Sequence, residues 1–109
     1  MSKYNAQKTV IDGITFDSKK EAHRYQELKW MQRAGQITDL KLQVPYEIIP
    51  SMRSPTTGRK VQATKYIADF VYRQRGLTVV EDVKGVRTQG YLLKKKLMLF
   101  MHGIEIREV

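Results

Sequence analysis

The sequence predicts an α/β (α+β) domain in which a mixed sheet is flanked by helices. Two segments carry apolar residues in helical patterns, and the stretches between them are rich in Val, Ile, Tyr, Phe and Thr. A chain of 109 residues is long enough for one modest core, so residues 1–109 are expected to form a single domain. The predicted order is α-β-β-β-α-β after a small N-terminal hairpin, which is typical of a mixed sheet between helices. The helices are expected within 16–37 and at 91–103, and the strands at 40–49, 65–73, 77–84 and 104–109.

The N-terminal segment begins with polar and basic residues, so residues 1–8 are expected to form a loose arm. Residues 9–16 predict a small hairpin, because Asp12-Gly13 suits a type I′ turn. A loop that packs Ile14 and Phe16 onto the core fits the same pattern.

The first helix has an N-terminal capping residue in Ser18 or Asp17, and Gly35 suits its end. Glu21 falls on the face that should be buried. Two interpretations of Glu21 stay open: a capping box with Ser18, or an inward-facing carboxylate with a chemical role. The buried face is expected to hold Ala22, Tyr25, Leu28 and Met31, and the outer face His23 and Trp30.

The middle of the chain predicts a strand at 40–49, in which Pro45 indicates an edge position or an irregularity. The turn-rich segment 50–63 carries Arg59 and Lys60 and predicts the tip of a long hairpin. As a basic, mobile loop it is a candidate for phosphate or groove contacts, and a solvated loop is an equal alternative.

The second helix contains too many apolar residues for one narrow stripe, so we expect it to be largely packed after a connection at 85–90. Lys94, Lys95 and Lys96 interrupt the apolar residues on one side and could hold a nucleic-acid backbone, or simply form a solvated face. The last strand should direct Ile104 and Ile106 to one face.

The hairpin formed by 65–73 and 77–84 carries carboxylates in line with apolar residues. A two-residue turn at Arg75-Gly76, or a four-residue loop in the same register, pairs Asp69 with Asp82. Cβ atoms of opposed residues lie roughly 5 Å apart, so two ionised carboxylates in these positions would repel each other. A divalent cation with a nearby lysine would offset this repulsion. The alternative interpretation is that both are solvated charges on an exposed face of the sheet. Because side chains alternate between the two faces of a strand, each strand should divide into two sets. In 65–73 one face should carry Ile67, Asp69 and Val71, and the other Tyr66, Ala68, Phe70 and Tyr72. In 77–84 one face should carry Val80, Asp82 and Lys84, and the other Leu77, Val79, Glu81 and Val83.

The charge of the chain points to a polyanionic partner. The formal net charge is +9, which favours nucleic acid first and an anionic membrane surface second. There is no cysteine, so disulfides and thiolate metal sites are excluded, and a cytoplasmic setting is expected. No run approaches the roughly 18 apolar residues of a membrane span, and no signal-peptide core is expected at the N-terminus.

The order of elements and motifs resembles the PD-(D/E)XK nuclease superfamily, whose fold is the restriction-endonuclease-like α-β-β-β-α-β core. Asp69 matches its first acidic residue, Asp82-Val83-Lys84 matches its second motif, and Ala68 stands where the motif name has proline. The segment FDSKKEA resembles the first-helix motif of the branch that includes phage Holliday junction resolvases, and Glu21 matches its glutamate. The whole chain, from SKYNAQKT to GIEIREV, is similar to small phage-encoded members of this superfamily.

The resemblance implies a metal-dependent DNA endonuclease that acts on branched or structured DNA. Asp69, Asp82, Glu21 and the Val83 carbonyl would hold one or two Mg²⁺ or Mn²⁺ ions, and Lys84 would orient water or stabilise the transition state. Two symmetric cuts in a four-way junction would need a homodimer. No membrane partner is expected. The expected location is the cytoplasm, that of a bacterial host if the chain is phage-encoded. The alternatives are a nonspecific or sequence-specific nuclease and a basic DNA-binding module without catalysis. The residues expected to contact DNA are Lys94, Lys95, Arg59, Lys60 and Arg87.

Overall fold

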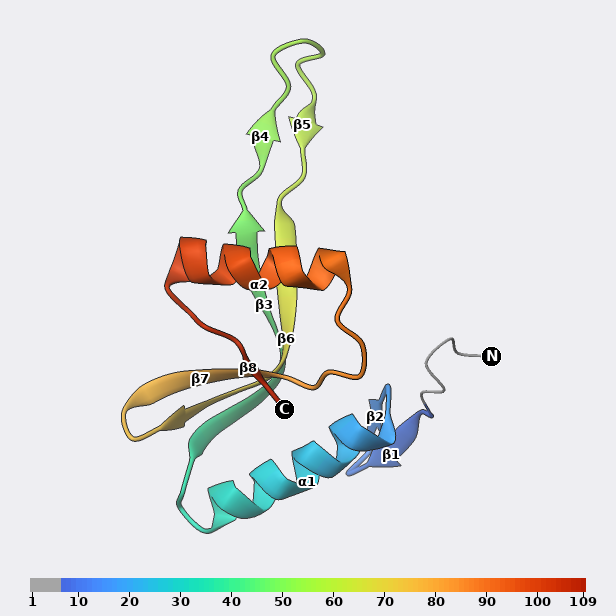
Figure 1. Ribbon diagram of the computed structural model, residues 1–109, viewed down its shortest axis with the longest axis vertical. Coiled ribbons are helices and arrows are strands. Elements are labelled where there is room, and N and C mark those ends of the chain that lie inside the picture. The colour runs from blue at the N-terminus through green and yellow to red at the C-terminus, as the bar shows by residue number, and fades with distance from the viewer. Residues whose placement is uncertain (1–6) are drawn as a thin grey trace.

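A computed structural model describes residues 7–109 and has an α+β fold (Figure 1). Most of the arm predicted at 1–8 therefore lies outside the described residues. No helix in the described part of the chain is long and apolar enough to cross a membrane. In chain order the elements are β1 (Thr9–Ile11), β2 (Ile14–Phe16), α1 (Lys19–Arg33), β3 (Thr38–Ile49), β4 (Met52–Arg53), β5 (Lys60–Val61), β6 (Thr64–Gln74), β7 (Leu77–Asp82), α2 (Gln89–His102) and β8 (Arg107–Glu108).

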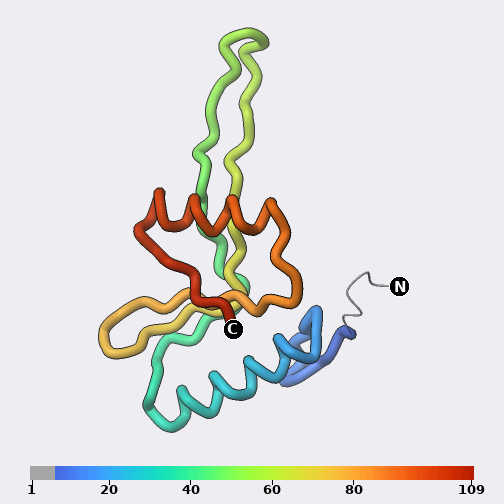
Figure 2. Tube along the Cα trace, in the orientation of Figure 1, coloured from blue at the N-terminus to red at the C-terminus, as the bar shows by residue number. Residues whose placement is uncertain are grey.

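The main sheet has the strand order β3-β6-β7-β8 and is mixed, as predicted. The pairs β3–β6 and β6–β7 are antiparallel, and β7–β8 is parallel. Parallel neighbours need a crossover, which α2 supplies: in Figure 2 the chain leaves β7, runs through α2 and returns beside β7. Pro45 lies in the edge strand β3, where its missing N–H leaves no gap in an inner ladder, so the edge prediction is confirmed.

The β1–β2 and β6–β7 hairpins both have the two-residue turns that the sequence predicts. Asp12 and Gly13 have φ of 53° and 74°, and Arg75 and Gly76 have φ of 52° and 75°. Two consecutive residues with positive φ are the requirement of a type I′ turn, whose twist suits two-residue hairpins. The second turn fixes the β6–β7 register, in which Val71 faces Val80 as expected.

Side chains on the two faces of β7 enter two different apolar clusters. Val80 belongs to the cluster that contains Tyr91 and Met98 of α2. Val79 packs against the cluster that contains Leu28 of α1. The sheet thus has one helix associated with each face, and the predicted alternation in 77–84 is confirmed.

The predicted alternation in β6 is wrong on one side of Asp69. Tyr66 and Ala68 lie in the α2 cluster, whereas Phe70 and Tyr72 lie in the α1 cluster. The register pairs Leu42 with Phe70 and Val44 with Ala68, so Gln43 faces Asp69 between them, and Gln43 has φ of 53°. This left-handed residue interrupts the regular pleat, and the strand changes the face that it buries at Asp69.

Helix α1 is capped and oriented as predicted. Ser18 is its N-cap, with Oγ accepting a hydrogen bond of 3.1 Å from the Glu21 amide, and Gly35 follows its C-cap residue with φ of 79°. Ala22, Tyr25 and Leu28 are buried and Met31 packs against their cluster, whereas His23 and Trp30 are exposed.

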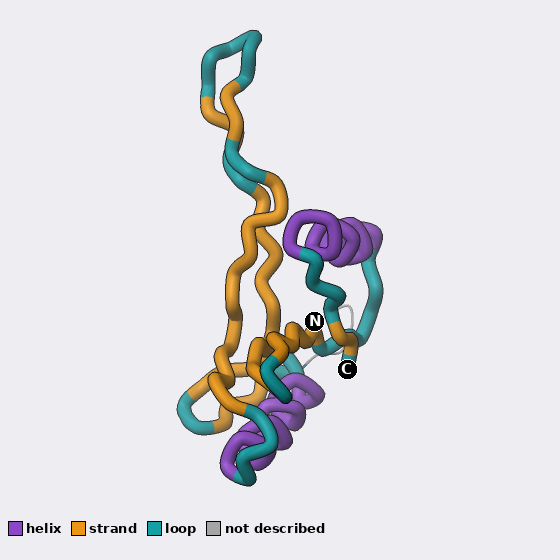
Figure 3. Tube along the Cα trace, turned by 90° about the vertical axis from the view of Figure 1, so that its left-hand side faces the viewer, coloured by secondary structure: helices purple, strands orange, loops and turns teal. Residues whose placement is uncertain are grey.

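The prediction that the second helix is largely packed is wrong. Only Tyr91 and Met98 of α2 are buried, and Phe100 is 81% exposed. The helix lies across one face of the sheet, and no other described element lies on the side of α2 away from the sheet (Figures 1 and 3). Leu92, Leu93, Leu99 and Phe100 form this outer apolar stripe, which is exposed throughout.

The segment predicted as the tip of a long hairpin is a two-stranded ribbon. β4 and β5 continue the direction of β3 and β6 and extend well beyond α2 (Figures 1 and 3). The last strand is shorter than predicted, but Ile104 and Ile106 both pack in the α2 cluster, so their shared direction is confirmed.

Candidate functional site

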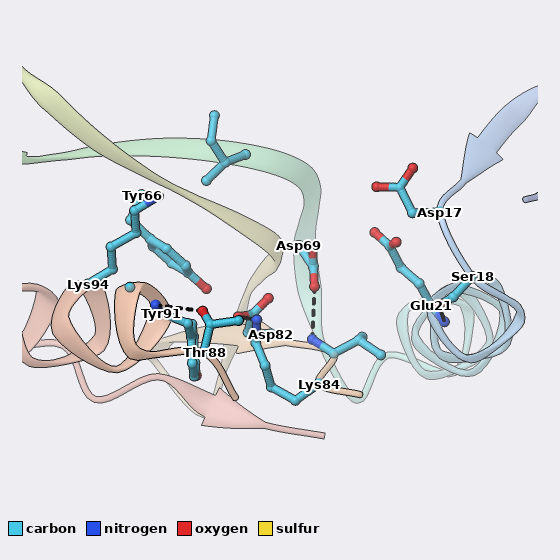
Figure 4. A pocket seen from close by; sticks show the side chains of 13 residues that line it. Asp17, Ser18, Glu21, Tyr66, Asp69, Asp82, Lys84, Thr88, Tyr91 and Lys94 are labelled. Atoms are coloured by element: carbon cyan, nitrogen blue, oxygen red, sulfur yellow. Dashed lines mark hydrogen bonds and ion pairs between the residues drawn. The ribbon is translucent and has the colours of Figure 1, made fainter. Parts of the chain in front are cut away.

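A pocket of about 500 Å³ opens where α1, β6, the end of β7 and the start of α2 meet. It contains all four residues that the sequence analysis places in catalysis (Figure 4). Its labelled lining residues are Asp17, Ser18, Glu21, Tyr66, Asp69, Asp82, Lys84, Thr88, Tyr91 and Lys94. Elements far apart in the sequence therefore bring the predicted residues to one place.

Asp69 lies in β6 at the point where the strand changes its buried face. Its Oδ2 accepts a hydrogen bond of 2.8 Å from the amide of Val83, the first residue after β7. The β6–β7 ladder runs as far as Phe70 and Glu81, so the same register brings Asp69 beside Asp82. This is the proximity of carboxylates that the sequence predicts.

Asp82 ends β7 and is 4% exposed. Lys84 Nζ lies 2.7 Å from Asp82 Oδ2, but without hydrogen-bond geometry, so this buried oxygen has an ion pair and no hydrogen bond. The same ammonium group lies 3.8 Å from the centroid of the Tyr91 ring, within cation–π distance. Lys84 is therefore held at the site by a carboxylate and an aromatic face.

The proximity of acidic groups perturbs Asp69. Burial, a hydrogen bond with Asp82 and the charges of Asp82 and Glu21 raise the pKa of Asp69 to about 8, against the lowering effect of the Val83 amide. Buried carboxylates this close disfavour simultaneous ionisation. Such a pair holds a proton, or else a cation that replaces the proton.

Glu21 reaches the pocket from the first turn of α1 and is 7% exposed. Its Oε1 accepts a hydrogen bond of 3.2 Å from Gln43 Nε2, the residue that faces Asp69. Burial raises the pKa of Glu21. The Ser18 side chain caps the Glu21 amide, which is one half of the capping box. The Glu21 carboxylate bonds to Gln43, and no bond from it back to the Ser18 amide is found among the described residues, so this side chain is available to the pocket.

The fit of this pocket to a divalent cation rests on its oxygen atoms. Asp69 and Asp82 fit, because hard cations take carboxylate oxygens and Asp82 Oδ2 is buried without a hydrogen bond. Within residues 7–109 no three acidic or histidine side chains are grouped closely enough to hold a metal, so the carboxylates that lie together in this arrangement are the pair Asp69 and Asp82. In Figure 4 Asp69 lies between Asp82 and Glu21, which face the same space.

Glu81, the other acid of this segment, points away from the pocket. It is fully buried and receives hydrogen bonds of 2.9 and 2.6 Å from Arg24 of α1 and another from the Tyr72 hydroxyl. The bond to Glu81 and burial raise the pKa of Tyr72 to about 12, with burial the larger cause. Glu81 is therefore already paired, and Asp82 is the acid that shares the pocket with Lys84.

The basic residues expected to contact DNA lie in three different surroundings. Lys94 lines the pocket. Lys95 and Arg87 both pair with Glu108, Lys95 at 3.0 Å, so their charges are partly neutralised within the protein. Arg59 and Lys60 lie on the ribbon, away from the pocket.

Three residues at the site were not identified from the sequence. The hydroxyl of Tyr66 is buried without a hydrogen bond, and burial followed by the charges of Asp82 and Asp69 raises its pKa. Tyr91 supports Lys84, and Gln43 binds Glu21. The irregularity at Gln43 hid Tyr66, because regular alternation places it on the opposite face from the pocket.

Comparison with known proteins gives a family and nothing more specific. No curated protein and no solved structure matches the chain. The sequence model of the family described as "Protein of unknown function (DUF1064)" matches residues 1–107, and the chain belongs to this family.

Proposed function

We propose that the protein is a metal-dependent endodeoxyribonuclease of the PD-(D/E)XK type, which hydrolyses phosphodiester bonds in branched or structured DNA. The observation that carries the proposal is the pairing of Asp69 and Asp82 in one pocket with Lys84. Solvated surface charges, the alternative interpretation, do not account for an Asp82 side chain that is almost fully buried.

Mg²⁺ or Mn²⁺ is the cofactor that these residues favour. Asp69 and Asp82 would hold it, with the Glu21 carboxylate and the Val83 carbonyl as the further ligands that the resemblance implies. When bound, the cation lowers the pKa of water and offsets the negative charge of a phosphodiester.

The other pocket residues bind and orient the DNA. Lys84, which Asp82 and Tyr91 hold in place, directs a positive charge into the pocket and stabilises charge that develops on the phosphate in the transition state. Lys94 lines the same pocket and is exposed, so it binds a neighbouring backbone phosphate.

Paired cuts in a four-way junction require two sites related by a twofold axis, so the proposal includes a homodimer. Of the twelve large apolar residues that are exposed in the described chain, five lie on α2. The outer apolar stripe of α2 is the surface that we assign to the dimer. A cytoplasmic location in a bacterial host belongs to the same proposal.

Nuclease action on linear duplex, nonspecific or sequence-specific, is the nearest alternative within this class. A second candidate from another class is a DNA-binding module without catalysis. The ion pair between Lys84 and Asp82 favours it, because a lysine can neutralise the buried carboxylate without a metal.

Substitution Asp82→Asn separates the candidates. For the nuclease we expect loss of cleavage with DNA affinity retained, because Asp82 acts on the cation and not on the DNA backbone. The matched control is Glu105→Gln, an exposed carboxylate outside the pocket. Equal loss of binding and cleavage, or loss of neither, would overturn the role assigned to Asp82.

A further inference from the structure

The ribbon of β4 and β5 is the largest feature that the candidate site does not use. Its ladder pairs Met52 with Val61 and Arg53 with Lys60, and all four residues are exposed. It stands clear of α2 and of the rest of the sheet in two perpendicular views (Figures 1 and 3). An isolated two-stranded ribbon is only marginally stable in water, so this extension is expected to serve an interaction.

The tip of the ribbon is held in one conformation by its own hydrogen bonds. The Ser54 amide donates to the Arg59 carbonyl at 2.8 Å, and the Gly58 amide donates to the Ser54 carbonyl at 2.9 Å. Arg53 Nη1 donates to the Gly58 carbonyl at 2.6 Å. These hydrogen bonds favour one turn conformation at the tip, which lowers the entropic cost of binding a partner.

The charge of the ribbon is uniformly positive. From residue 50 to residue 68 the chain has four basic residues and no acidic residue. Arg59 and Lys60 form no ion pair with any other described residue. The whole chain carries +9, so this ribbon adds to a positive field that attracts a polyanion.

The size of the ribbon matches one feature of duplex DNA. Paired strands lie about 4.8 Å apart, and the major groove, about 12 Å wide, admits a two-stranded ribbon. The minor groove, about 6 Å wide, accepts β-strand readers where the DNA is kinked or widened, so undistorted B-DNA favours the major groove for this ribbon. Val61 and Gly58 precede Asp69 by 8 and 11 residues, which correspond to roughly 25–35 Å of extended strand.

We propose that this ribbon enters the major groove of a duplex arm, about one helical turn from the site where the backbone occupies the pocket. The inference rests on the proposed function for DNA as the partner. A separation of roughly 25–35 Å corresponds to about 8–10 base pairs of B-DNA. Arg59 and Lys60 bind phosphates or guanine edges, and Met52 and Val61 meet thymine methyl groups.

The ribbon gives the protein a preference for duplex that continues on one side of the cut. A flap or single strand in that position offers no groove, so the ribbon would have nothing to enter. Arg53 is a positioning residue in this proposal, because its guanidinium group donates a hydrogen bond to the Gly58 carbonyl and so supports the tip of the ribbon.

Binding measured in chelator tests the ribbon apart from cleavage. The double variant Arg59→Gln/Lys60→Gln is compared with Lys29→Gln/Arg33→Gln, two basic residues near the C-terminal end of α1. We expect the ribbon variant to bind a 30-base-pair duplex about tenfold more weakly, with the slope of log K against log salt reduced by about 2. The control should keep both values. A ribbon variant that binds like the control would overturn the proposal.

A shortened ribbon provides a second, independent variant. Residues 52–61 are replaced by Asn-Gly, which joins Ser51 and Gln62 by a two-residue turn because the ladder places these two residues opposite each other. The removed residues between 52 and 61 are all exposed or half-buried, so the core is untouched. Reduced DNA affinity is expected; a change of oligomeric mass with unchanged affinity would assign the ribbon to a second copy and overturn the proposal.

The position of the ribbon on DNA is measured by directed cleavage. The chain has no cysteine, so Thr56→Cys at the tip and Asp17→Cys at the rim of the pocket each accept one iron–EDTA label. On a four-way junction the two labels should cut the same arm about 8–10 base pairs apart, with guanine N7 protected from methylation under the tip. Cuts at one place, or no protected guanine, would contradict the major-groove placement. If the unmodified protein cleaves no DNA yet these patterns appear, the nuclease proposal fails and the ribbon proposal stands.

Discussion

Asp69 Oδ2 accepts a hydrogen bond of 2.8 Å from the amide of Val83, and this bond joins β6 to the residue directly after β7. It holds the Asp69 carboxylate beside Asp82 although no ladder pair is formed between these two residues. The backbone thus keeps together two carboxyl groups that would repel each other if both were ionised.

The stability of the metal-free protein should fall as pH rises from about 4 to 8. Asp69 has a pKa of about 8 in the folded protein, against an ordinary value of 3.8, so in this range the folded protein keeps a proton that the unfolded chain has released. Folding then takes up a proton, and each rise in pH disfavours it until about pH 8. Thermal unfolding in chelator measures this, and Asp69→Asn should flatten the curve. The Glu105→Gln control should keep the slope; a variant Asp69→Asn with the slope unchanged would assign it to other groups.

At pH 8 and above, divalent cations should restore the stability that the metal-free protein loses between about pH 4 and 8. A ligand that binds only the folded protein at one hundred times its dissociation constant stabilises it by about 2.7 kcal/mol. Mn²⁺ should therefore raise the melting temperature, and its electron paramagnetic resonance signal should broaden on binding. Asp82→Asn should abolish both effects, while Glu105→Gln should keep them. Equal Mn²⁺ binding by Asp82→Asn would place the cation elsewhere.

Arg24 and Glu81 are expected to stabilise the fold without a part in catalysis. The Arg24→Met substitution leaves the Glu81 carboxylate buried without its cation, which typically costs 3–5 kcal/mol. Because the Arg24 side chain is 20% exposed, we expect a loss of unfolding free energy at the lower end of this range, about 3 kcal/mol, when unfolding is measured in urea. Glu27→Gln, at a half-exposed partner of the same arginine, should change stability little. Loss of cleavage by folded Arg24→Met would show that the pair also supports the pocket.

The outer apolar stripe of α2 should mediate dimer formation. Burial of an unpaired charge at the twofold interface would destabilise the dimer. The variant Phe100→Glu should therefore have the mass of a monomer in sedimentation equilibrium. Paired cuts in a four-way junction should become single nicks, with the pocket intact. Val10→Glu, at an exposed apolar residue in the N-terminal hairpin, is the matched control and should leave the mass unchanged. A dimer that persists in Phe100→Glu would place the interface on another surface.

Much of this structure could be predicted because local chemistry determines it. Asp12-Gly13 and Arg75-Gly76 specify their turns, Ser18 and Gly35 bound α1, and the two-residue period of β7 separates Val79 from Val80. From these features the Asp69–Asp82 register follows.

The remaining features depend on tertiary contacts. The left-handed backbone at Gln43 changes the face that β6 buries. Pro45 indicates an edge position or an irregularity in this strand but does not locate the change of face, so Tyr66 was assigned to the wrong face. The exposure of α2 is the second case, because an apolar composition does not distinguish a residue buried in the core from one on an uncovered surface. Arg87 and Lys95 are the third, since Glu108 lies beside them only in the folded chain.

The central claim is that Asp69 and Asp82 support metal-dependent hydrolysis of DNA. The most direct measurement is cleavage of a labelled four-way junction and of a linear duplex of matched sequence, with Mg²⁺, with Mn²⁺ and with chelator, beside Asp69→Ala. We expect paired nicks in the junction that need metal and are absent from the duplex and the variant. Equal cutting of both substrates would keep the nuclease and remove the preference for branches. Tight, salt-sensitive binding with no cutting under any condition would contradict the claim and leave a DNA-binding module.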